Sequence, residues 1–85
     1  MLIFSIIDRT TKDFGLPFYQ PTKDTAIRSF RDLANDPESM IYKHPDDFTL
    51  FELGQFSPST GQITGHDKPI VVVNALEIQN PQAAE

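Results

Sequence analysis

The chain has 85 residues, the size of a single domain, and carries a formal net charge of −5 with no cysteine. Because cysteine is absent, disulfide bonds and thiolate metal sites are excluded. The acidic balance argues against a protein that coats nucleic acid through bulk charge, since such binding needs Lys and Arg to neutralise phosphates. The N-terminal apolar run is too short for a signal-peptide core or a transmembrane helix, so we expect a soluble intracellular protein with no membrane association.

The first half of the chain predicts a strand, a loop and one amphipathic helix. Residues 1–8 are rich in β-branched and aromatic side chains and predict a strand. Polar residues 9–17 predict a loop, and Phe18 and Tyr19 form a short extended piece between two prolines. Thr22 is the expected N-cap of a helix that ends at the Asn-Asp-Pro sequence. Helical spacing places one buried stripe on its inner face: Ala26, Ile27, Phe30, Leu33 and Ala34.

The second half predicts a loop followed by strands and turns. The stretch 36–47 holds two prolines and several charged side chains, which is typical of a loop with at most one short turn. Residues 48–56 predict a strand in which Gly54 marks a bulge or the close approach of another backbone. The remaining elements are a turn at 57–61, a short returning strand at 62–64, a second turn at 65–69, a final strand at 70–78 and a flexible C-terminal tail at 79–85.

Together these elements predict a single α+β domain over residues 1–78, with an antiparallel or mixed sheet of three to five strands and one amphipathic helix packed on one face. The strands are apolar at consecutive positions, so both sheet faces need cover, and one helix covers only one of them. Either a second copy of the chain packs on the other face, or loop side chains fold back over it, namely Phe14, Leu16, Phe18, Met40 and Tyr42. We favour a homodimer, because small domains gain stability from extra burial and symmetric dimers are the commonest oligomers.

No motif for catalysis, metal binding or cofactor binding is recognisable. His44 and His66 lie in proline-flanked loops beside aspartates, without the spacing that converging metal ligands require. The five serines lack the glycine context of a nucleophile, and the four glycines form no phosphate-binding pattern. We therefore expect a protein that binds rather than catalyses, with no cofactor and no metal.

A local basic surface is compatible with the acidic total. Arg9 and Lys12 follow the first strand, Lys23 and Arg31 belong to the helix, and Lys43 lies in the long loop. Aromatic side chains in loops offer platforms on which bases stack. The sequence therefore gives one set of candidate contacts to single-stranded DNA: Arg9, Lys12, Lys23, Arg31, Lys43, Tyr19 and Tyr42. The competing interpretation is that the loop aromatics complete the core.

Residues 26–63, with the sequence AIRSFRDLANDPESMIYKHPDDFTLFELGQFSPSTGQI, resemble the small nonstructural protein of gokushovirus-type microviruses. These are tailless phages with a circular single-stranded DNA genome. The opening MLIFSIIDR with PFYQPT, and the SPSTGQI turn before a last apolar strand, extend the resemblance to residues 1–78. KHPDDFTLFELG is the most specific part, because it is long and no composition bias explains it.

The resemblance implies a nonstructural phage protein of the host cytoplasm, because this family is likened to the microvirus protein that turns replication towards single-stranded DNA synthesis and packaging. It implies a non-catalytic binding adaptor whose partners are phage replication or packaging proteins. Direct binding of single-stranded DNA is one alternative. A second is a host-takeover factor that binds a bacterial protein.

Overall fold

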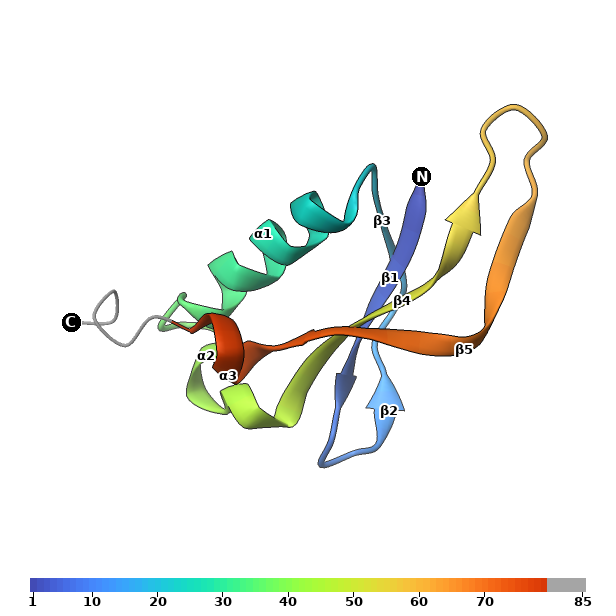
Figure 1. Cartoon of the computed structure of the whole chain (residues 1–85). Coiled ribbons are helices and arrows are strands. Elements are labelled where there is room, and N and C mark those ends of the chain that lie inside the picture. Colours follow the sequence, from blue (N-terminus) through green and yellow to red (C-terminus); the bar gives the residue numbers. More distant parts are fainter. Residues whose placement is uncertain (80–85) are drawn as a thin grey trace.

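A five-stranded antiparallel sheet with one long helix packed on it forms the protein (Figure 1). The computed structural model describes residues 1–79. The strands run in the order β2-β1-β4-β5, and β3 also pairs with β1, so the predicted α+β class is confirmed. The elements are β1 (Leu2–Asp8), β2 (Asp13–Phe14), β3 (Phe18–Gln20), α1 (Lys23–Ala34), α2 (Met40–Lys43), the 3₁₀ turn η1 (Pro45–Asp47), β4 (Phe48–Phe56), β5 (Ile63–Asn74) and α3 (Ala75–Ile78).

Helix α1 begins at a reciprocal cap. The Thr25 backbone N–H donates to the Thr22 hydroxyl at 3.1 Å, and the Thr22 backbone N–H donates to the Thr25 hydroxyl at 3.2 Å. The predicted N-cap is therefore confirmed, and it satisfies N–H groups that have no partner within the helix. The buried line of α1 runs at intervals of four through Ala26, Phe30 and Ala34. The predicted burial of Leu33 is wrong: it lies off this line and is 41% exposed.

The core lies between α1 and one face of the sheet. Its fully buried large side chains are Phe4 of β1, Phe30 of α1 and Leu50 of β4. Ile41 of α2 and Ala75 of α3 join the same cluster, so the two short helices extend this layer beyond α1. The small side chains on the inner line of α1 allow the helix backbone to approach the strands closely.

The β4–β5 hairpin differs from the prediction in its second strand. β5 is continuous from Ile63 to Asn74, where two pieces separated by a turn were expected. Glu52 pairs with Ile70 and Gly54 with Gly65, so residues 66–69 bulge out within one strand instead of reversing the chain. The prediction for Gly54 is confirmed, because a Cβ atom there would lie 2.1 Å from the Thr64 carbonyl oxygen.

The final strand ends earlier than predicted. Asn74 is the N-cap of α3: its side-chain oxygen accepts from the Leu76 N–H at 3.0 Å, and the Glu77 carboxylate accepts from the Asn74 N–H at 3.3 Å. This second capping box starts a helical turn where the sequence predicted more strand. The side chain of Gln79, the first residue of the predicted tail, donates to the carbonyl oxygens of Ala34 and Tyr42 at 3.2 and 2.8 Å. The rest of that tail, residues 80–85, lies outside the described residues.

Two connecting segments also carry local structure. Within the predicted loop 9–17, Asp13 and Phe14 form β2 and pair with Asp8 and Ile7 of β1. Segment 36–47, where a loop with one short turn was predicted, holds two short helical elements, α2 and η1. Among residues 1–79, no helix is long and apolar enough to cross a membrane.

Candidate interaction surface

The sheet face opposite α1 carries a second set of apolar side chains. Strand alternation separates Ile3, Ser5 and Ile7 of β1 from the core residue Phe4, so they belong to this other face. Residues directly opposite each other on neighbouring strands share a face. The cross-strand partners on this side are Tyr19 opposite Ile3, Phe51 opposite Ser5, Phe14 opposite Ile7, Val71 opposite Phe51, and Phe56 opposite Ile63. We call this surface the helix-free face.

One end of the helix-free face holds an aromatic pair beside two cations. The rings of Phe14 and Phe51 pack edge to face with centroids 5.2 Å apart, and Val71 next to Phe51 is 63% exposed. A shallow depression of about 430 Å³ opens here. It is lined by Ile7, Arg9, Lys12, Asp46, Thr49, Phe51, Val71 and Asn74. Its charged side chains come from the β1–β2 turn and η1, and its apolar ones are those of Ile7, Phe51 and Val71.

The charge of Arg9 at this end is already paired. Its guanidinium lies 2.9 Å from an Asp46 carboxylate oxygen and 3.2 Å from one of Asp47. The negative charge of Asp46 is the main cause that raises the pKa of Arg9, with a hydrogen bond to Asp47 next. The Arg9 backbone N–H also donates to the Asp47 carbonyl at 2.8 Å, so the pairing is fixed by the chain as well as by the side chains.

The turns that border this end carry a net negative charge. Residues 8–13 and 45–47 hold two cations, Arg9 and Lys12, and four carboxylates, a formal sum of −2 over the turns, whereas Arg9, Lys12 and Asp46 are the charged residues that line the depression itself. The carboxylates are those of Asp8, Asp13, Asp46 and Asp47. Hydrogen bonds from the hydroxyl and backbone N–H of Thr10, at 2.7 and 3.0 Å, lower the pKa of Asp8 and hold it ionised. A phosphate backbone would meet repulsion here as well as attraction.

The opposite end of the helix-free face is also aromatic. Tyr19 and Phe56 pack edge to face with centroids 6.1 Å apart and, with Met1, line a depression of about 420 Å³. Ile63, the cross-strand partner of Phe56, is 63% exposed. Between the two ends the face is closed, because Ser5 is fully buried and its hydroxyl donates to the Gly15 carbonyl at 2.7 Å.

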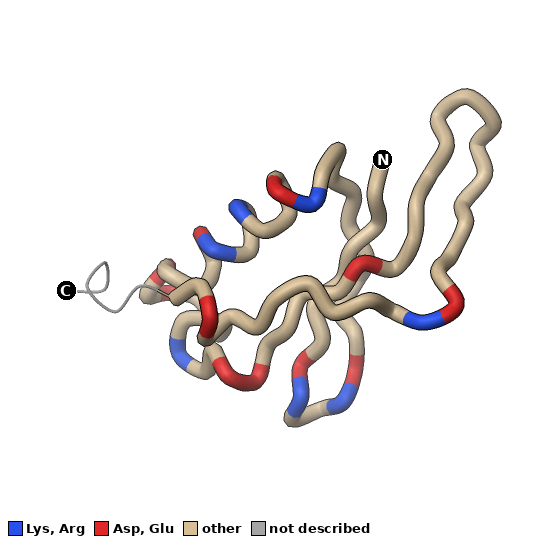
Figure 2. Tube along the Cα trace, viewed as in Figure 1, with Lys and Arg blue, Asp and Glu red and all other residues tan. Residues whose placement is uncertain are grey.

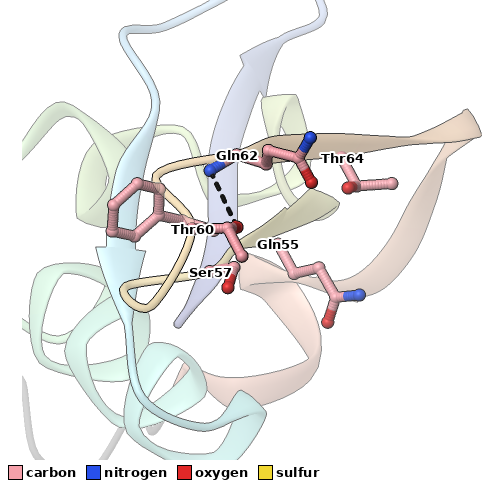
Figure 3. A pocket seen from close by; sticks show the side chains of 6 residues that line it. Gln55, Ser57, Thr60, Gln62 and Thr64 are labelled. Atoms are coloured by element: carbon pink, nitrogen blue, oxygen red, sulfur yellow. Dashed lines mark hydrogen bonds between the residues drawn. The ribbon is translucent and has the colours of Figure 1, made fainter.

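The end of the β4–β5 hairpin, residues 53–65, forms an arm without a single charged side chain in a chain that is 22% charged (Figure 2). The arm has two different sides. Phe56 and Ile63 continue the helix-free face, while the other side carries amides and hydroxyls (Figure 3). A depression of about 410 Å³ is lined by Gln55, Phe56, Ser57, Thr60, Gln62 and Thr64. The backbone N–H of Gln62 donates to the Thr60 hydroxyl at 3.3 Å inside it.

The structure does not gather the predicted DNA contacts into one strip (Figure 2). Lys23 and Arg31 lie on α1 and Lys43 on α2, which belong to the helical layer. Tyr42 is a half-buried residue of the same layer. Only three of the predicted residues belong to the helix-free face or its rim: Arg9, Lys12 and Tyr19. No finding tests DNA contact by any of the seven, so these assignments stay a prediction.

Sequence reasoning missed the partners that complete this surface. Phe51, Phe56, Ile63 and Val71 were assigned to strands but not to a site. The sequence signal that could have found them is the run of consecutive apolar residues in each strand, because such runs require both faces of the sheet to be covered. Which of these residues share a face depends on two register shifts between β4 and β5. Gly54 is a sequence signal for the shift between Glu52 and Gly54, whereas the shift between Leu50 and Phe51 has no local sequence signature.

Neither histidine lines the depressions at the two ends of the helix-free face, and the two have different neighbours. His66 Nε2 lies 2.7 Å from a Glu52 carboxylate oxygen, across the bulge of β5. His44 caps the end of α2 and lines a separate depression with Asp8 and Asp47. Within the described part of the chain, no group of three or more His, Cys, Asp or Glu side chains is placed to hold a metal ion.

Comparison with known proteins identifies the family of this chain. The family model described as phage ORF5 protein matches residues 1–78. No significant match to this chain was found among curated proteins or among solved structures. The match covers all described elements and agrees with the phage part of the resemblance, while the narrower gokushovirus assignment stays a prediction. The chain therefore belongs to the phage ORF5 protein family.

Proposed function

We propose that this phage protein is a nonstructural, non-catalytic adaptor of the host cytoplasm that binds protein through its helix-free face. In this role it assists the switch from genome replication to single-stranded DNA synthesis and packaging. The observation that carries the proposal is that each end of that face holds an aromatic pair with one exposed ring, Phe14 at one end and Tyr19 at the other. Exposed apolar patches on small monomers mark interaction sites. The stage of the phage cycle rests on the resemblance to gokushovirus proteins.

The charge balance supports a protein partner over a nucleic acid. Arg9 is held by two aspartates, and the turns that border its end of the face carry a formal charge of −2. Protein interface cores are depleted in charged residues and enriched in aromatic residues. The arm has no charged residue, and each end of the helix-free face holds an aromatic pair. A bacterial protein captured by the same face remains the host-takeover alternative.

One observation favours direct binding of single-stranded DNA as the second candidate. Phe51 lines one depression together with Arg9 and Lys12, and Phe14 packs against Phe51. A stacking platform next to cations is how single strands are bound. Binding of a labelled oligonucleotide across salt concentrations separates the two. Neutralising two phosphates predicts a slope of about −1.4 in log affinity against log salt, which Arg9→Ala with Lys12→Ala would remove. If the adaptor proposal is right, the oligonucleotide should not bind at physiological salt, and the double substitution should not change that result.

The adaptor proposal is tested in infected cells. A phage that lacks this gene is complemented with the wild-type chain, with Phe14→Lys or Tyr19→Lys, and with the matched change Leu76→Lys in the helical layer. We expect the wild type and Leu76→Lys to restore single-stranded genomes and particle yield. The two face variants should leave double-stranded replication intact and reduce single strands at least several-fold. Full restoration by both face variants would refute the proposal.

A further inference from the structure

We propose that the occupant of the helix-free face is a second copy of this chain, packed face to face and head to tail about a two-fold axis through the middle of the face. The inference rests on the proposed function and deepens it, since it names a second copy as the protein that this face binds, so that the adaptor acts as a dimer. The end with Phe14 and Phe51 in each copy would lie on the end with Tyr19 and Phe56 in its partner. The dimer would then be a two-layered sheet sandwich with the α1 helices on its outer sides.

The exposed apolar side chains supply more than half of the area that a standard interface buries. Five large apolar side chains of this face are 43–63% exposed: Met1, Phe14, Tyr19, Ile63 and Val71. Fully exposed side chains of this size present about 150–250 Å², so the five leave roughly 500 Å² in water. A standard interface buries about 800 Å² per partner. The backbone and polar atoms of the arm and of the β1–β2 turn supply the remainder.

The pattern of the face is self-complementary. An isologous dimer requires the same patch to match itself after a half turn. The pairs Phe14–Phe51 and Tyr19–Phe56 have similar edge-to-face geometry, with interplanar angles of 76° and 70°, and they lie at opposite ends of the face. Ser5, on the β1 segment between them, is fully buried. A half turn about this middle therefore places each pair of one copy on the other pair of its partner.

Charge decides the orientation. All charged side chains of the depression at one end, Arg9, Lys12 and Asp46, lie by the β1–β2 turn and η1, while the arm at the other end has none. A head-to-head dimer would bring each of these charges against its own copy, which costs energy. The head-to-tail dimer places the uncharged arm of the partner over this end, where Arg9 keeps its own partners Asp46 and Asp47. The apolar side of the arm, with Phe56 and Ile63, then faces the interface.

The helical layer is the weaker candidate for self-association. It also exposes apolar side chains, namely Leu33, Met40 and Leu76. Charged residues stand directly beside two of them in the sequence, Asp32 next to Leu33 and Glu77 next to Leu76. Burial of these charges without partners would oppose association. The helix-free face exposes apolar side chains at both of its ends, so a second copy gains most by packing there.

Sedimentation of the full chain between 1 and 100 µM tests the dimer. We expect a mass of twice 9.6 kDa for the wild type, and a weakening of dimerisation by at least tenfold for Phe14→Lys and for Tyr19→Lys. Both positions lie outside β5, so their effect reports on the face and not on pairing of the β5 edge. Leu76→Lys, which places the same charge at a 55% exposed position of the helical layer, should stay dimeric. Far-ultraviolet circular dichroism confirms that each variant folds.

Cysteine crosslinking tests the orientation, because the chain has no cysteine of its own. Phe14→Cys mixed with Tyr19→Cys should give a covalent dimer on oxidation, whereas neither variant alone should. Crosslinking of Phe14→Cys with itself would overturn the head-to-tail arrangement. A wild type that sediments at 9.6 kDa up to 100 µM, or dissociation by Leu76→Lys alone, would overturn the dimer.

The two proposals fail in different ways. If the wild type is a monomer but the face variants still lose single-stranded synthesis in infected cells, the dimer is wrong and the adaptor function stands. If the face variants become monomers yet restore infection fully, the dimer stands and the adaptor function of this face is wrong.

Discussion

Of the four glycine-to-alanine substitutions that this chain allows, the one at Gly54 should weaken the β4–β5 hairpin most. The added Cβ would lie 2.1 Å from the Thr64 carbonyl oxygen and 2.8 Å from the Gly65 Cα. Both atoms belong to the β5 backbone, so the strands would have to separate by more than about 1 Å to regain an ordinary contact. Overpacking of this kind costs about 1–3 kcal/mol.

The assay is thermal and urea unfolding followed by circular dichroism at one fixed protein concentration, because self-association would make stability depend on concentration. A loss of about 2 kcal/mol lowers Tm by roughly 8–16 °C in a domain of this size. Gly65→Ala is the matched control, since its nearest contact would be the Leu53 carbonyl oxygen at 3.9 Å. We expect the control to stay within about 0.5 kcal/mol of the wild type. Equal stability of the two variants would refute the reasoning.

Three further outcomes follow from the core, the second cap and the β1–β2 turn. Phe30→Ala should lower the unfolding free energy by about 3–5 kcal/mol, whereas Leu33→Ala, one turn away but exposed, should cost less than about 1 kcal/mol in the same urea titration. Asn74→Ala should cost about 2 kcal/mol in urea, because the side chain caps α3 and donates to three oxygens of η1 and β4 at 2.9–3.1 Å; no change would contradict the cap. Thr10→Ala should raise the pKa of Asp8 towards its ordinary 3.8 in a carboxyl NMR titration, and an unmoved pKa would contradict the hydrogen-bond cause. Because the folded pKa of Asp8 is depressed, its contribution to stability is present above pH 3.8 and is lost as the pH falls through the folded value, so the variant and the wild type should converge in acid.

Local chemistry was enough to predict β1, α1, β4 and two of the special positions, whereas β2 and α3 were not predicted. The helical period, the Thr22 cap and the Asn-Asp-Pro stop gave α1, because each acts within a few residues of the backbone it affects. Gly54 was recognisable because glycine inside a strand pattern indicates a backbone contact. The end of β5 was predicted too late, because the capping box of Asn74 and Glu77 outweighed the apolar pattern of the residues around it.

The sequence by itself also determined that one sheet face would lack a helix, since two apolar faces and one helix leave a surface without cover. Only the tertiary structure decided which side chains make that surface. Phe14 meets Phe51, and Arg9 meets Asp46, through strand register and through the bulges that shift it. Register is set by contacts between segments that are distant in the chain, and a change of one residue moves every side chain to the opposite face. The predicted DNA contacts are spread over the molecule (Figure 2), because Lys23, Arg31 and Lys43 lie on helices while Arg9 and Lys12 border the helix-free face. Strand register instead assembled an aromatic surface from residues that no local pattern connects.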